Sequence, residues 1–93
     1  MDKEFKGLRF KRLKDMVLSE QYLIFTEKSE RVGHVSLRRG LLVCHYLSEN
    51  NEILYHFNFF NKLKSRFANE AERNYYLRIC AHCIRKRMEK EDD

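Results

Sequence analysis

The spacing of three histidines is the feature that most constrains this fold. His34, His45 and His56 stand eleven residues apart, and the segments between them contain Arg39-Gly40 and Asn50-Asn51. Both dipeptides suit two-residue hairpin loops, because Gly and Asn tolerate the positive φ that these turns need. Two such turns would align the three imidazoles in one row across a three-stranded antiparallel meander.

This register also sorts the side chains onto two faces of the sheet. The predicted core face carries Val35, Leu37, Leu42, Cys44, Tyr46, Ile53, Tyr55, Phe57 and Phe59. The other face carries the histidines with Ser36, Val43, Leu47, Leu54 and Asn58. A three-residue loop with Gly40 in a bulge is the alternative, and it would set His34 opposite Cys44. Because strand side chains alternate between faces, that slip would exchange the two sets in the first hairpin.

The segments before the meander predict a helix and one further strand. Phe5, Leu8, Leu13, Met16 and Val17 share a broad helical face, and Asp2 is a candidate N-cap. Gly7 weakens this helix, and a short basic strand around Leu8-Arg9-Phe10 is the competing interpretation. The run from Tyr22 to Glu27 predicts a strand, and the polar stretch 28–31 predicts a turn.

The apolar period changes to about 3.6 residues from Asn61 onward. Asn69 followed by Glu72 resembles a capping box, which predicts a helix from Glu70 to about Lys90. The expected fold is therefore α+β and a single domain over residues 1–93. It has an N-terminal helix, a four-stranded antiparallel meander, and a long C-terminal helix packed on one sheet face.

The C-terminal helix is apolar over more of its circumference than packing on one sheet face requires. The surplus must be covered either by the N-terminal helix or by a second subunit. For a homodimer, the predicted interface residues are Tyr76, Cys80, Ile84 and Met88. Ile84→Asp would then give a monomer or an unfolded chain.

Positive charge is the second informative quantity. Nineteen Lys and Arg against fourteen Asp and Glu leave a formal net charge of +5, and the excess is clustered. Such clusters suit a polyanion, because nucleic acid phosphates release counterions when Lys or Arg binds them. The residues expected to contact nucleic acid are Arg9, Lys11, Arg12, Arg38, Arg39, Arg85 and Arg87. The alternative function is an adaptor or inhibitor whose basic face docks an acidic protein partner.

Three groups of residues are candidates for binding or catalysis. The histidine row resembles a zinc ligand set in residue type, but it has no neighbouring Asp or Glu as a second-shell partner. On a helix, Cys80 and Cys83 share a face while His82 points away, so these three residues do not converge on one ion. Tyr55, Phe57 and Phe59 alternate like a base-stacking platform, but they share the predicted core face. We expect no enzymatic activity and no cofactor, with the contact surface on the side of His45, His56, Asn58 and Arg38.

The number of cysteines and the distribution of apolar residues predict the cellular compartment. Three cysteines are an odd number, which argues against a secreted disulfide framework. No segment resembles an apolar signal sequence or a membrane span. We therefore expect a cytoplasmic or otherwise intracellular protein with no membrane partner.

Overall fold

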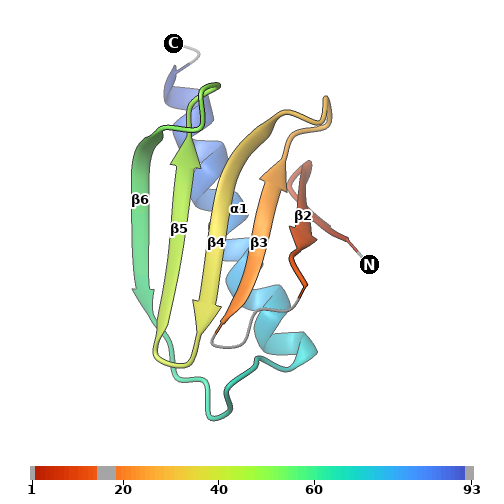
Figure 1. Ribbon diagram of the computed structural model, residues 1–93, viewed down its shortest axis with the longest axis vertical. Helices are drawn as coiled ribbons and strands as arrows, with labels where there is room; N and C mark the ends of the chain where they lie inside the picture. Colours follow the sequence, from red (N-terminus) through yellow and green to blue (C-terminus); the bar gives the residue numbers. More distant parts are fainter. Residues whose placement is uncertain (1, 15–18, 92–93) are drawn as a thin grey trace.

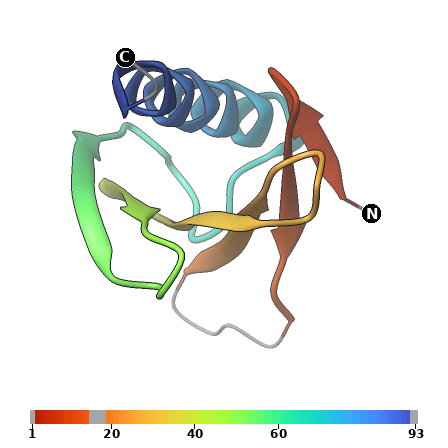
Figure 2. The ribbon, with the colours of Figure 1, turned by 90° about the horizontal axis from the view of Figure 1, so that it is seen from above.

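The computed structural model describes residues 2–14 and 19–91. Within these residues the chain forms two layers, a curled six-stranded antiparallel sheet and one helix along its concave side (Figures 1 and 2). The strands are β1 (Lys3–Phe5), β2 (Leu8–Arg12), β3 (Glu20–Phe25), β4 (Arg31–Arg38), β5 (Leu41–Leu47) and β6 (Ile53–Phe60), and the helix is α1 (Glu70–Glu91). Each strand pairs with the next in sequence.

The predicted N-terminal helix is wrong. Lys6 and Gly7 both have positive φ, 52° and 75°, which is the backbone that a two-residue hairpin turn uses. The turn joins β1 to β2 and pairs Phe5 with Leu8. The sheet therefore has six strands and not the four that were predicted.

The competing strand around Leu8-Arg9-Phe10 is the correct interpretation. Leu8 and Phe10 are buried and Arg9 is only partly so, which is the period of two expected for a strand. Asp2 caps no helix; its carboxylate lies 3.8 Å from Nε of Arg9. The predicted helix also used residues 16 and 17, which lie outside the described residues.

The histidine register is confirmed although one of its two turns was assigned wrongly. Gly40, with φ of 93°, forms the β4–β5 turn as predicted, and His34 pairs with His45. At the next turn Ser48 N donates to Glu52 O, so the loop holds three residues and not the two of Asn50-Asn51. The register then shifts by one residue between Tyr46 and Leu47, and Leu54 has no partner. The two departures cancel, so His45 still pairs with His56.

The concave side of the sheet forms the core with α1. The alternating inward residues of β2 to β5 are buried, and the helix adds a stripe of its own. The core cluster is Leu8, Phe10, Tyr22, Ile24, Val35, Leu37, Leu42, Cys44, Tyr46, Leu63, Ala68, Leu77, Cys80, Ala81 and Ile84. Phe57 and Phe59 of β6 pack partly buried against it, as predicted. The core-face prediction is wrong for Ile53 and Tyr55, which are 57% and 42% exposed, and Leu47, assigned to the other face, is buried; the register shift next to Leu47 breaks the predicted alternation there.

The C-terminal helix begins at the predicted cap. Asn69 Oδ1 accepts a hydrogen bond from the Glu72 amide at 2.8 Å, and Glu72 Oε1 accepts one from the Asn69 amide at 2.9 Å. This reciprocal pair satisfies two amides that the first helical turn leaves without partners. The capping prediction is therefore confirmed.

Most of the wide apolar arc of α1 is buried within the chain, although Tyr75 remains 62% exposed. The sheet curls so that the helix contacts β5 on one side and β1 on the other (Figure 2). Cys80 and Ile84 are fully buried, and Tyr76 and Met88 pack against the same core. The residues predicted to form a dimer interface thus line the core of the monomer, because β1 and the curled sheet cover the surplus.

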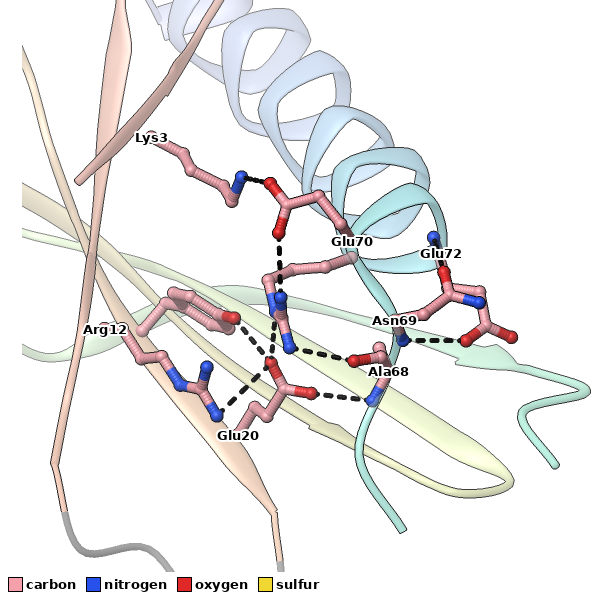
Figure 3. A network of polar contacts seen from close by, with 9 residues as sticks. Lys3, Arg12, Glu20, Ala68, Asn69, Glu70 and Glu72 are labelled. Atoms are coloured by element: carbon pink, nitrogen blue, oxygen red, sulfur yellow. Dashed lines mark hydrogen bonds and ion pairs between the residues drawn. The ribbon is translucent and has the colours of Figure 1, made fainter. Parts of the chain in front are cut away.

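A buried carboxylate fixes the start of α1 to the sheet (Figure 3). Oε1 of Glu20 accepts hydrogen bonds from Tyr22 at 2.7 Å and from Nε of Arg73 at 2.6 Å. Oε2 accepts one from the Ala68 amide at 2.8 Å. Burial acts to raise the pKa of Glu20, but the hydrogen bonds from Arg73, Tyr22 and Ala68 outweigh it and hold the pKa below its ordinary value. The carboxylate is therefore charged in a buried position and ties β3 to α1.

Candidate nucleic-acid interface

The convex face of the sheet carries the histidine row. No described helix covers this face, since α1 lies on the concave side (Figure 2). The ring centroids of His34 and His45 are 6.2 Å apart with the rings nearly parallel, and those of His45 and His56 are 6.5 Å apart and edge to face. The row extends further, because Lys11 pairs with Leu23 and Leu23 pairs with His34. A cation thus stands at one end of the imidazole row.

The pKa values of His34 and His45 are lowered, which favours their neutral forms. Partial burial, followed by the neighbouring His45 and Arg31, lowers the pKa of His34. Partial burial and then His56 lower the pKa of His45. Neutral imidazoles offer flat rings and one hydrogen-bond donor each, which suits contact with nucleobases more than direct pairing with phosphate at neutral pH.

The histidines are not placed as a metal site. Among residues 2–14 and 19–91, no group of three or more His, Cys, Asp or Glu side chains is arranged to hold a metal ion. Cross-strand neighbours project side by side from the sheet, and the ring spacings above show no convergence on one point.

The convex face is free of carboxylates over most of its width. The sole acidic residue in strands β2–β6 is Glu20, and its side chain is buried on the concave side. The outward positions of these strands include Arg9, Lys11 and Arg38. Arg9 lies over the ring of Phe25, 5.1 Å from its centroid. The face therefore presents cations and aromatic rings to a ligand with little electrostatic repulsion of an anion.

Asn61 joins two basic segments at one end of the molecule. Its side-chain oxygen accepts a hydrogen bond from the Gly40 amide, and its side-chain nitrogen donates to the Arg38 carbonyl, both at 2.8 Å. The turn with Arg38 and Arg39 is thereby held to the segment that follows β6, at the lower end in Figure 1. That segment contains the exposed residues Lys62, Lys64 and Arg66. No local sequence pattern indicates these two hydrogen bonds, because they join residues more than twenty positions apart.

The seven basic residues predicted to bind nucleic acid do not form one patch. Arg9, Lys11, Arg38 and Arg39 lie on the convex face or at its lower end. Arg12 is on the concave side, with a nitrogen 3.8 Å from Oε1 of Glu20.

Arg85 and Arg87 are engaged on the helix side of the molecule. Nε of Arg85 donates to the Lys6 carbonyl at 2.7 Å. The guanidinium of Arg87 lies over the ring of Tyr55, 4.3 Å from its centroid. These two cations therefore support the fold, and they point away from the histidine row.

Phe60 is an outward aromatic residue that the sequence analysis overlooked. It pairs with Leu41, which pairs with Arg38, and it is 93% exposed. Strand alternation gave a usable signal, since Asn58 was already assigned to the outward face. Phe60 follows the core residue Phe59 directly at the end of the strand, so the two together read as one apolar run.

Comparisons with known proteins add no family. No protein-family model, no curated protein and no solved structure matches the chain. No helix among the described residues is long and apolar enough to cross a membrane.

Proposed function

We propose that this protein is a non-enzymatic module that binds single-stranded nucleic acid on the convex face of its sheet. One observation carries the proposal: an uncovered face whose strands β2–β6 present no carboxylate holds three imidazoles in a row, with Lys11 beyond one end of the row and Arg38 at the lower end of the face. Open antiparallel sheets with aromatic rings and flanking cations are suited to unstacked bases.

The proposed contacts are of two kinds, those to phosphates and those to bases. Lys11, Arg38 and Arg39 are exposed and would bind phosphates, which contributes affinity for any sequence. The imidazole rings would stack with bases or bond to their edges. A duplex keeps its bases stacked inside, so the histidine row favours a single strand as ligand.

The test is a titration of a fluorescent single-stranded oligonucleotide, as RNA and as DNA, over a range of salt. We expect the logarithm of the binding constant to fall with the logarithm of salt by about 0.7 per phosphate neutralised. The double variant Lys11→Ala with Arg38→Ala should lower both the affinity and this slope. It should leave the unfolding free energy within about 0.5 kcal/mol per site, as exposed substitutions usually do.

A matched control separates the face from net charge. Lys28→Ala with Lys90→Ala removes the same charge from exposed positions in the β3–β4 loop and near the C-terminal end of α1. Equal weakening by both double variants would contradict a site on the convex face. Absence of binding to either strand at low salt would contradict the function itself, and an acidic protein partner would then be the function to test.

A further inference from the structure

The free edge of β6 lacks a partner. β6 is the last strand of the sheet and pairs only with β5. No hydrogen bond from the described part of the chain reaches its other edge. A strand of eight residues with unpaired amides and carbonyls is a template for another strand.

Exposed apolar side chains are concentrated on this strand. The described chain exposes six large apolar residues, and four of them belong to β6. These are Ile53, Leu54, Tyr55 and Phe60, which are 57%, 48%, 42% and 93% exposed. No residue of β6 carries a formal charge apart from its one histidine, so the strand has none of the Lys or Glu that usually block an edge.

The opposite edge of the sheet is protected. β1 has three residues, two of which are Lys3 and Glu4. Lys3 donates to Glu70 at the start of α1, and the helix contacts this strand. The chain thus blocks one edge by shortness, charge and cover, and leaves the other edge long and apolar.

We propose that a second copy of this chain pairs with β6 in antiparallel orientation, giving one continuous twelve-stranded sheet. The charges that flank β6 favour this occupant. Glu49 and Glu52 precede the strand, while Lys62 and Lys64 follow it. Antiparallel pairing of two copies sets the acidic end of one against the basic end of the other, whereas parallel pairing would set like charges together.

The pleat restricts the register of this pairing. Residues directly opposite each other in an antiparallel pair lie on the same face, so only even offsets are allowed. The register with Phe57 opposite the partner's Phe57 satisfies this condition. It sets Tyr55 opposite the partner's Phe59. Beyond the bulge at Leu54 it brings Glu52 near the partner's Lys62 and Leu54 near the partner's Phe60, so that exposed side chains lose water together.

This dimer goes beyond the binding of nucleic acid and is tested without it. Sedimentation velocity of the full chain at high micromolar concentration should show a dimer. Phe60→Lys should give a folded monomer, since it places a charge at the edge and removes the contact with Leu54. The far-UV circular dichroism and melting temperature of the variant report that the chain is folded.

Charge reversal tests orientation and register. Glu52→Lys and Lys62→Glu should each raise the dimer Kd by about tenfold, because each creates two like-charge pairs across the two-fold axis. The combined Glu52→Lys/Lys62→Glu variant should restore the Kd of the wild type. The control Glu27→Lys/Lys28→Glu, in the β3–β4 loop, should leave it unchanged.

Three results would overturn the proposal. One is a wild-type chain that is a monomer at high micromolar concentration. Another is a folded Phe60→Lys variant that remains a dimer. The third is a pair of weakening single reversals that the combined variant does not repair.

Discussion

The two faces of the sheet are built from the same strands, but one is buried against α1 and the other is exposed to solvent. The concave face is covered by α1, and its one acidic residue, Glu20, is tolerated because Tyr22, Arg73 and the Ala68 amide all donate to it. The convex face carries three histidines and several cations in partly exposed positions. Strand alternation therefore separates the residues that pack the core from those of the proposed binding face, and substitutions on the two faces should have separable effects.

The largest effect is expected in the centre of the concave side. Ile84→Asp places an unpaired charge in a fully buried site on α1, and it should lower the unfolding free energy by more than about 3 kcal/mol. Asn58→Asp adds the same charge to an exposed convex position and should cost far less. Urea unfolding of the two variants measures the contrast. Similar losses would mean that the faces are not divided as described.

The next effect concerns Glu20. Glu20→Gln removes the charged acceptor of Arg73 and should cost about 2 to 3 kcal/mol at neutral pH. Because the pKa of Glu20 is lowered from 4.5 in the folded chain, its charge stabilises the fold above pH 4.5. That contribution is lost as the pH falls below 4.5 through the folded pKa.

The pKa of Glu70 is also lowered, chiefly by its hydrogen bond with Lys3, so the pH dependence of Glu20 is compared with that of Glu70. As the pH falls below 4.5, the wild type should lose stability more steeply than Glu20→Gln does. Glu70→Gln is the matched control, since Glu70 binds Lys3 and Arg73 at an exposed site. A parallel acid dependence in Glu20→Gln and the wild type would show that the buried carboxylate is not the titrating group.

The smallest effect belongs to the histidine row. The pKa values of His34 and His45 are lowered from 6.5, so their neutral forms stabilise the fold above pH 6.5 and this contribution is lost as the pH falls. His34→Gln with His45→Gln should flatten the stability profile between about pH 7.5 and pH 5.5. His82→Gln, at an exposed position of α1, is the control.

The same pair of histidines should make oligonucleotide binding depend on pH. Phosphate close to the row would favour the protonated imidazoles, so oligonucleotide binding should tighten as the pH falls from 7.5 to about 6. The gain should vanish in the His34→Gln/His45→Gln variant. Binding that is independent of pH in the wild type would mean that no phosphate lies close to the row.

Much of the candidate site could be predicted from sequence because it rests on alternation. The pairing of His34 with His45 follows from a period of two and from a two-residue turn, both of which are local. The prediction of the second turn failed because the assumed turn length was wrong. At 48–52 the assumed turn was wrong, and a bulge at Leu54 restored the register by an amount that no local rule supplies.

The sequence by itself determined the strands β3 to β6, most of their core face, the pairing of His34 with His45 and the capped start of α1, because each depends on neighbours along the chain. Only the tertiary structure decided that residues 3–12 form a hairpin, and that the curled sheet consumes most of the broad apolar arc of α1. It also decided that Arg12, Arg85 and Arg87 turn away from the convex face and that the edge of β6 stays open. These features depend on which distant segments compete to cover apolar surface, and burial is a property of the whole chain.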